Sequence, residues 1–392
     1  MTLLRNCRVV DVRKGLVKET SIAIEGSKIV SIGGRKESDN QFINLEGGYL
    51  LPGLINSHAH LGEAFPSYEM DPKEGPAIQV LRCYRRGMEA LRAGITTVRT
   101  MLTRYGADIS LRFMIQQGWV NGPRIRSAGR GICVTGGHGS PSGALLADGP
   151  EEFRKKAREE LAAGADHLKI FITGGIDSRE EMFDEPQMTF EEMEATVSVA
   201  RSKNAYVAAH AGDSKPILAA LKAGVMCFEH GYFLDHNAAR MIHEKGAYLC
   251  PTMCVSRSPQ WMKESRFEPW KIDKALSVAS DHLGSTRAAI REGVKIINGT
   301  DIPPGDLDNG INITVKEMEY LVGAGLSPLG SIQATTLIAA ELMGMEKEAG
   351  VVEPGYYADL IAVRENPLKN IEACRSIFFV MKGGEIIRWD KS

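Results

Sequence analysis

Two histidines, His58 and His60, stand two positions apart directly after the apolar run at residues 49–54. Side chains alternate between the faces of a strand, so both imidazoles point to the same side. Imidazole is a common ligand of metal ions, and two imidazoles on one face form half of a metal site. Because a His-x-His pair also arises by chance, the interpretation depends on the residues downstream.

Four further reactive side chains stand at or near the ends of strand-like segments: Lys169, His210, His230 and Asp301. Alternation supports a common orientation, because an inward-facing Lys169 places its two neighbours toward surrounding helices. The carboxyl ends of parallel strands meet at one place, so these residues are expected to meet there too. The spacing therefore predicts one site that is built by several strands.

The segments that must position these residues alternate between helix and strand patterns along residues 51–352. One helix pattern, residues 189–203, begins with the capping-box sequence Thr-Phe-Glu-Glu. The sequence predicts eight strands, which end near residues 60, 100, 127, 171, 210, 230, 251 and 301. Eight strands that alternate with helices are typical of a (β/α)₈ TIM barrel, an α/β fold with its active site at the strands' C-terminal ends.

Short strands and turns occupy both ends of the chain, residues 1–50 and 353–392. Neither section can bury a face by itself, so we expect the two to combine into one small β-sandwich domain. The predicted domains are thus this sandwich and a barrel at residues 51–352.

Composition narrows the class of protein. The chain has 392 residues, of which 43% are hydrophobic and 24% charged, and a formal net charge of −2. These values are ordinary for a globular protein and favour neither nucleic acid nor an anionic membrane as a partner. The chain has no secretory-type leader pattern and no apolar stretch near the ~20 residues of a membrane span. We expect a cytoplasmic homo-oligomer that acts on a small molecule.

The seven cysteines are odd in number and scattered, mostly within apolar segments. This pattern favours reduced thiols in the core over a disulfide framework. We interpret none of them as a metal ligand.

Together these motifs resemble the amidohydrolase superfamily with a binuclear metal centre: His-x-His, a strand-four lysine, single histidines ending strands five and six, and Asp301 in Gly-Thr-Asp. Residues 135–139 (Thr-Gly-Gly-His-Gly), 164–170 and 229–231 (Glu-His-Gly) resemble the imidazolonepropionase-related branch. That branch includes Xaa-Pro dipeptidases (prolidases) and arginine or lysine carboxypeptidases.

The resemblance implies a ligand set. Lys169 would be carboxylated by CO₂ to a carbamate that bridges two divalent metal ions. His58, His60 and Asp301 would bind the more buried ion, and His210 and His230 the more exposed one. Zinc is favoured by histidine-rich ligation, although manganese, cobalt and iron stay open. A bridging hydroxide would attack the carbonyl, and Asp301 would transfer its proton to the leaving amine.

Three residues are predicted to contact the substrate. His138, in a glycine-rich loop, either meets a substrate carboxylate or carbonyl or staples its loop. Tyr232 either donates to a developing oxyanion or is a rim aromatic. Arg257 either meets a carboxylate or is a solvated loop residue. It lies in a long segment, with Trp261, Phe267 and Trp270, that we expect to cover the site.

The remaining histidines carry no ligand prediction. His167 is expected to be a hydrogen-bonded core residue, and His236, His243 and His282 fall on surface patterns. The loop at residues 302–310 departs from the dipeptidase-like pattern, because it holds acids where a His-Gly pair is usual. An acidic loop either favours a cationic substrate or is a solvated turn.

The sequence thus predicts a metal-dependent amidohydrolase that cleaves a dipeptide or an N-acyl amino acid with a free carboxylate. A first alternative is a hydrolase of an aryl amide, urea, carbamate or lactone on the same scaffold. A second is a mononuclear deaminase or cyclic-amide hydrolase that lacks the carbamate. A non-catalytic scaffold is a third.

Overall fold

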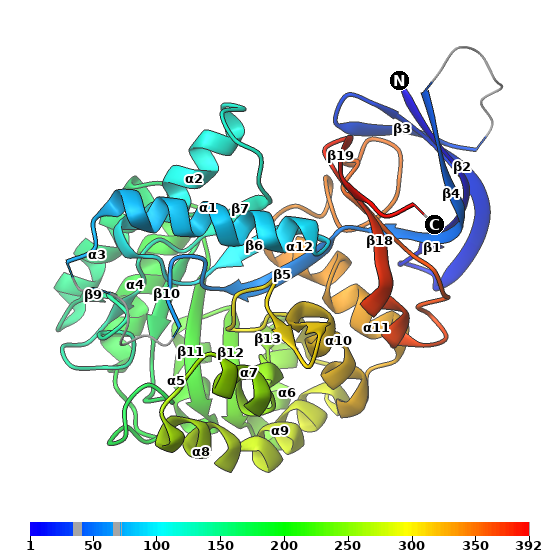
Figure 1. Ribbon diagram of the computed structural model, residues 1–392. Helices are drawn as coiled ribbons and strands as arrows, with labels where there is room; N and C mark the ends of the chain where they lie inside the picture. Colours follow the sequence, from blue (N-terminus) through cyan, green and yellow to red (C-terminus); the bar gives the residue numbers. More distant parts are fainter. Residues whose placement is uncertain (34–40, 66–70, 72, 392) are drawn as a thin grey trace.

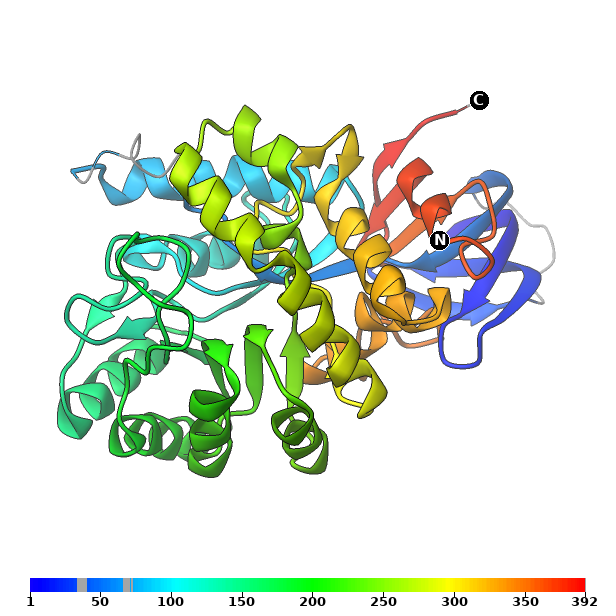
Figure 2. The same cartoon turned by 90° about the horizontal axis from the view of Figure 1, so that it is seen from below.

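The computed structural model describes residues 1–33, 41–65, 71 and 73–391. Its body consists of parallel strands with helices outside them, and a separate sheet lies at one end (Figures 1 and 2). The body strands are β5 (Leu54–Ala59), β6 (Ile95–Thr100), β7 (Arg124–Ser127), β8 (Ile132–Cys133), β9 (Leu145–Leu146), β10 (Leu168–Phe171), β11 (Val207–Asp213), β12 (Cys227–Phe233), β13 (Tyr248–Cys250) and β14 (Lys295–Ile296).

The body strands do not form the continuous closed barrel that the sequence predicts. They pair as a three-stranded sheet, β5-β6-β7, and a seven-stranded sheet, β14-β13-β12-β11-β10-β8-β9. A few backbone hydrogen bonds link the two sheets, among them those from Ser57 to Asn298 (2.7 Å) and from Asp166 to Ser127 (2.7 Å). The ladders stop there because β14 has only two residues and because β8, not β7, pairs with β10.

Helices follow most of the strands, as the alternating pattern predicts. The predicted capping box is present: the Thr189 hydroxyl accepts from the Glu192 N–H, and Glu192 accepts in return from the Thr189 N–H. The helices are α1 (Pro76–Arg92), α2 (Ala107–Gln116), α3 (Pro150–Ala162), α4 (Phe190–Ser202), α5 (Ser214–Ala223), α6 (His236–Glu244), α7 (Pro259–Glu264), α8 (Pro269–Ser277), α9 (Ala279–Arg291), α10 (Ile313–Ala324), α11 (Pro328–Ala334) and α12 (Leu337–Leu342).

Both ends of the chain pair in one sheet, drawn blue and red in Figure 1. The N-terminal and C-terminal strands form one seven-stranded sheet, in the order β19-β18-β17-β4-β1-β2-β3, and not one sheet for each end of the chain. It encloses its own apolar core, which includes Leu4, Ile22 and Phe379. Its strands are β1 (Thr2–Asp11), β2 (Leu16–Glu25), β3 (Lys28–Ile32), β4 (Gln41–Pro52), β17 (Leu360–Val363), β18 (Ile377–Lys382) and β19 (Glu385–Trp389).

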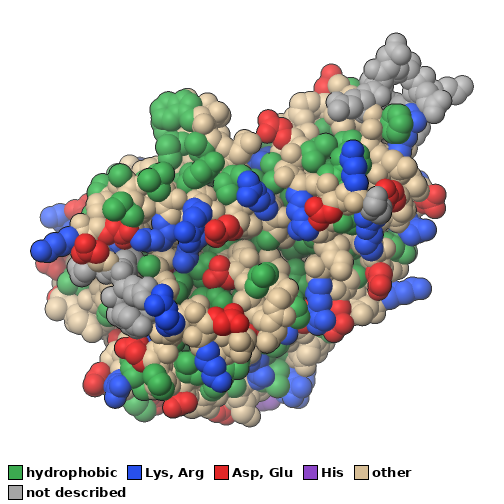
Figure 3. Space-filling model, viewed as in Figure 1, with side chains coloured by type: hydrophobic (Ala, Val, Ile, Leu, Met, Phe, Trp, Pro, Cys, Tyr) green, Lys and Arg blue, Asp and Glu red, His purple; other side chains and the backbone are tan. Residues whose placement is uncertain are grey.

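Acidic and basic side chains are mixed over the face in Figure 3, while apolar side chains gather on the protrusion that carries the end of α2. Phe113 and Trp119 are 51% and 68% exposed there. All seven cysteines are buried free thiols, which confirms the prediction for them. Among the residues that the structure describes, no helix is both long and apolar enough to cross a membrane.

Candidate metal centre

Eight of the nine predicted site residues line one cavity. They come mainly from the C-terminal ends of the body strands: β5 and its following loop, β10, β11 and β12, and the turn after β14. The eight are His58, His60, His138, Lys169, His210, His230, Tyr232 and Asp301. The structure thus brings together side chains that lie far apart in the sequence.

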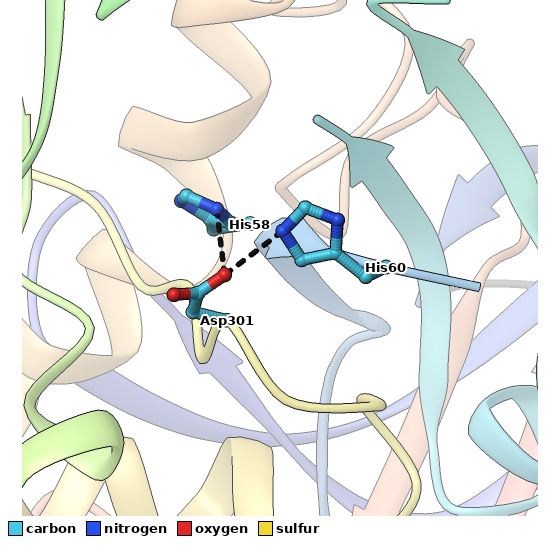
Figure 4. Close-up of side chains that lie close together, drawn as sticks. All are labelled: His58, His60 and Asp301. Carbon is cyan, nitrogen blue, oxygen red and sulfur yellow. Dashed lines mark ion pairs between the residues drawn. The ribbon is translucent and has the colours of Figure 1, made fainter. Parts of the chain in front are cut away.

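Asp301 lies between the two histidines of the His-x-His motif (Figure 4). Its Oδ1 atom is 3.0 Å from His58 Nε2 and 2.9 Å from His60 Nε2. Three convergent nitrogen and oxygen donors of this kind suit a divalent ion such as zinc. His58 and His60 are buried, whereas the Asp301 side chain is 24% exposed toward the cavity.

Three histidines are oriented by partners on their Nδ1 atoms. His58 Nδ1 lies 2.7 Å from Glu229, His230 Nδ1 2.7 Å from the Thr252 hydroxyl, and His60 Nδ1 3.3 Å from the Leu102 carbonyl. A partner on one ring nitrogen fixes the tautomer and leaves the other nitrogen for a metal. In all three rings the nitrogen left for a metal is Nε2, which in His58 and His60 faces Asp301.

Lys169, His210 and His230 form the other side of the centre. The rings of His210 and His230 are 4.6 Å apart, and the His230 ring is 5.3 Å from that of His58. His210 differs from the other histidines because its Nε2 lies 3.1 Å from the Gly174 carbonyl, which leaves Nδ1 free. Lys169 is 1% exposed and lines the same cavity.

Burial sets the protonation of these groups. It lowers the pKa of His210 and His230 well below the usual value, so both rings are neutral and can act as ligands. Burial likewise lowers the pKa of Lys169, which favours the neutral amine that adds CO₂. At His60 burial also lowers the pKa, but Glu63 and Asp301 outweigh it and raise the pKa to about 9. A metal ion that binds His60 must therefore displace a proton from its ring.

A buried ion pair supports His58, and the sequence analysis does not predict it. Glu229 is fully buried, and its two oxygens lie 2.7 Å from His58 Nδ1 and 2.8 Å from Arg99 Nη2. Burial alone would raise the pKa of Glu229, but Arg99 and His58 outweigh it and hold that pKa well below its usual range. Glu229 is thus a carboxylate that fixes the His58 ring.

Cys250 also lies near His58 and Glu229, close enough for the three to form a second possible ligand group. Two observations argue against it. Burial raises the pKa of the Cys250 thiol well above its usual value, which disfavours the thiolate that binds metals. Both Glu229 oxygens already have partners.

Two site residues have left-handed backbone, with φ of 57° at Asp301 and 71° at His230. Such values are uncommon outside glycine and recur at functional sites. At Asp301 the turn is held by its N–H, which donates to the His58 carbonyl (2.9 Å). At His230 it interrupts the alternation of β12, so that His230 and its neighbour Glu229 both face the centre.

His138 and Tyr232 flank the centre. The His138 ring stacks on that of His210 (4.2 Å), and its Nδ1 lies 2.8 Å from Glu181. The Tyr232 ring stacks on that of His230 (5.3 Å), and the side chain is almost fully buried. Burial raises the pKa of Tyr232 well above its usual value, so the phenol keeps its proton and can donate it in a hydrogen bond.

Arg257 is the predicted substrate residue that the structure does not bring to the cavity. Its guanidinium donates to the Ala279 carbonyl instead, and its own carbonyl accepts from Tyr320 (2.8 Å). The segment around it does reach the cavity, which Trp261 and Phe267 line. Trp270, which was grouped with them, instead lies beside Arg179.

Two histidines differ from their predictions. His282, expected on the surface, is fully buried, where Nε2 lies 2.8 Å from the Pro251 carbonyl. Two helices, α8 and α9, meet at Val278, and His282 is on the buried face of α9. His167 is buried as expected, but neither ring nitrogen has a hydrogen-bond partner within the described ranges; its ring stacks on Tyr206.

The sequence also matches a protein family: residues 49–388 match the amidohydrolase family. The chain belongs to this family. As a member, it is a hydrolase that acts on carbon–nitrogen bonds, and the resemblance seen in its motifs is confirmed. An ochratoxinase from Aspergillus niger is 31% identical over 377 residues, which cover 86% of this chain and 75% of the relative.

Solved structures give the same result. A Xaa-Pro dipeptidase with bound methionine in its active site is 32% identical, with a TM-score of 0.89 and 99% coverage of both chains. A prolidase in complex with N-methylphosphonate-L-proline is 27% identical, with a TM-score of 0.90 and coverage of 99% of this chain and 100% of that one. This chain therefore has the amidohydrolase fold, with the sheets of parallel strands described above.

Proposed function

We propose that this amidohydrolase cleaves the amide bond of a dipeptide or an N-acyl amino acid that carries a free carboxylate. The convergence of His58 Nε2 and His60 Nε2 on Asp301, at 3.0 and 2.9 Å, carries the proposal. The similar structures support the substrate class, because one is a Xaa-Pro dipeptidase and another is a prolidase in complex with N-methylphosphonate-L-proline.

The donors present would hold two divalent ions, with zinc preferred for the histidine-rich set. His58, His60 and Asp301 would hold one ion and His210 and His230 the other, with a carboxylated Lys169 between them. When bound, such ions lower the pKa of water and polarise a carbonyl. We further infer that the two sheets of body strands together form one barrel, since backbone hydrogen bonds of 2.7 Å link the two sheets on both sides.

The chain's own residues would supply the proton transfers. Asp301 accepts a proton from the attacking water and returns it to the leaving nitrogen as the carbon–nitrogen bond breaks. Tyr232, a buried phenol that keeps its proton, donates a hydrogen bond to the oxygen that gains negative charge. His138, held by Glu181, faces the substrate carboxylate. Water adds to the carbonyl, and the products are a carboxylate and an amine.

The first experiment is elemental analysis of metal per chain, on protein purified without chelator and with bicarbonate, combined with the intact mass. We expect two equivalents and the added mass of one CO₂, which is lost in Lys169→Ala. One equivalent without added mass would favour the mononuclear deaminase or cyclic-amide hydrolase, and a folded protein without metal would favour a scaffold.

The second experiment compares each dipeptide with the same dipeptide amidated at its carboxyl end. We expect cleavage of the free acid only. Equal rates for both would favour the alternative hydrolase of aryl amides, ureas, carbamates or lactones. The domain boundaries, the cytoplasmic location and the homo-oligomer stay predictions from the sequence.

A further inference from the structure

Three aromatic rings lie together on one side of the cavity: Phe65, Trp261 and Phe267, here called the aromatic wall. Their centroids are 5.2 Å (Phe65–Trp261), 5.6 Å (Phe65–Phe267) and 5.3 Å (Trp261–Phe267) apart. The rings come from the loop after β5, from α7 and from the connection between α7 and α8. All three line the cavity that contains the metal centre, so a group on a bound substrate can reach them.

The wall favours a neutral group over a cation. Aromatic faces attract cations, but a cationic side chain of the protein already lies near two of these rings. The Arg86 guanidinium is 5.5 Å from the Phe65 centroid, and the Lys271 ammonium is 5.0 Å from that of Phe267. Met262, another apolar side chain, lines the cavity beside the wall. These two ring faces are therefore already occupied by cations, one of them Lys271, which is paired with Asp177. A neutral apolar group would find apolar contacts at the wall.

The acidic loop at residues 302–310 holds the wall in place. Asp306 accepts a hydrogen bond from the Trp261 indole N–H (2.9 Å), and Asp308 accepts from the Trp261 backbone N–H (3.1 Å). Asp308 is 1% exposed, so it is not a solvated turn residue. The sequence analysis left two interpretations of the acidic loop, a contact with a cationic substrate and a solvated turn. Asp306 and Asp308 instead accept hydrogen bonds from Trp261 of the same chain. Because the indole N–H has its partner, the Trp261 ring is preorganised for apolar contact.

We propose that the aromatic wall is the subsite for a neutral aryl or other large apolar group of the amide substrate, with Asp306 as a positioning residue. The inference rests on the proposed function and narrows its substrate class to amides that carry such a group on one side of the scissile bond. The wall and the metal ligands line the same cavity, so a group held by the wall would lie beside the metal centre.

The test compares dipeptides that differ in one side chain: Ala-Ala, Phe-Ala, Ala-Phe, Lys-Ala and Ala-Lys. At one of the two positions, kcat/KM for phenylalanine should exceed that for alanine by about tenfold or more, the scale expected for burying an aromatic side chain. At that position, kcat/KM for the lysine dipeptide should not exceed kcat/KM for Ala-Ala. A preference for lysine would overturn the proposal in favour of a cationic subsite.

Variants assign the preference to the wall. Trp261→Ala should lower kcat/KM on the phenylalanine dipeptide about tenfold and leave Ala-Ala within about threefold. Trp119→Ala, which removes a tryptophan that is 68% exposed on the α2 protrusion, is the matched control and should change neither. Asp306→Ala should raise KM more than it lowers kcat, and Asp306→Asn, which keeps an acceptor oxygen, should restore KM.

Each outcome decides between the inference and the proposed function. Cleavage of Ala-Ala with no phenylalanine preference would overturn the inference and leave the function standing. If no dipeptide is cleaved, binding of N-acetylphenylalanine and N-acetylalanine by calorimetry replaces turnover. Tighter binding of the phenylalanine compound, lost in Trp261→Ala, would support the wall, and equal binding would overturn it. If Trp261→Ala does not fold, Phe267→Leu takes its place under the same criteria.

Discussion

The floor and the wall of the cavity are built in different ways. The floor, formed by His58, His60, Lys169, His210, His230 and Asp301, is carried by strands and by the turns at their ends. Its rings are fixed by buried hydrogen bonds such as that between His58 and Glu229 (2.7 Å). The aromatic wall is carried by loops and short helices, and its rings are fixed by contacts with one another and by the loop at residues 302–310.

This difference separates chemistry from selectivity. Metal ligands must be held to within a fraction of an ångström, which packed strands with hydrogen-bonded partners can do. A subsite for an apolar group tolerates looser geometry, because hydrophobic contact has no preferred direction. A change in the floor should therefore abolish turnover of every substrate, whereas a change in the wall should alter which substrate is preferred.

The largest effect is expected for Lys169→Ala. The variant should lose metal and activity on all substrates, beyond the roughly 10–100-fold loss typical of a residue that only supports a ligand. Because the missing group would be a carboxylate, a short carboxylic acid such as propionate should restore part of kcat and of the metal content. Steady-state kinetics and elemental analysis with and without the acid provide the measurement. Full activity in the variant would disprove the carbamate.

A smaller effect is expected for Glu229→Gln. The amide keeps the shape of Glu229 but loses the charge that faces Arg99 and His58, so the His58 tautomer is no longer fixed. Metal affinity should fall by about 10–100-fold, measured as metal content at equilibrium in chelator buffers.

Glu317→Gln is the matched control for that measurement, because Glu317 is equally buried but binds the N–H groups of Met253 and Cys254 instead. It should keep the metal affinity of the wild type. An unchanged affinity in Glu229→Gln would mean that the carboxylate is structural and does not orient the ligand.

The floor could be predicted from the sequence because strand periodicity and strand ends are local signals. His210 follows the apolar segment at residues 205–209, and Lys169 lies in the strand pattern at residues 166–171; parallel strands bring such segments together. The role of Glu229 could not be predicted, since alternation places it opposite His230. Only the left-handed backbone at His230, with φ of 71°, lets both face the centre.

The wall could be predicted only in part. Trp261 and Phe267 were expected to cover the site, but Phe65 was not. The hydrogen bond from Trp261 to Asp306 joins α7 to a loop 45 residues further along the chain. Loops have no periodicity from which such a contact could be inferred. His282 shows the same limit in a helix: α9 packs inward a face of small polar residues, among them Ser285, which resembles a surface pattern in sequence.

The smallest predicted effect is a pH dependence of stability, and it arises where α10 contacts the segment that leads from the floor to the wall. Glu317, on α10, accepts hydrogen bonds from Met253 and Cys254, which begin the segment that leads to the wall, at 2.8 Å each. Burial raises the pKa of Glu317 from 4.5 to about 7 in spite of these two donors. The folded protein therefore binds this proton more tightly than the unfolded chain does between these two values.

Stability that depends on this proton is fully present below about pH 4.5 and is lost as the pH rises through about 7. Between about pH 5.5 and 7 the free energy of unfolding should fall on the order of 1 kcal/mol more in the wild type than in Glu317→Gln, which has no proton to lose. Melting temperatures of both proteins across this range test the slope, and comparing slopes removes the constant cost of the substitution. Equal slopes for the two proteins would show that Glu317 is ionised in the folded protein throughout this pH range. The contact between α10 and the segment that leads to the wall would then be held by a charged carboxylate, and the wall, like the floor, would depend on a buried ion.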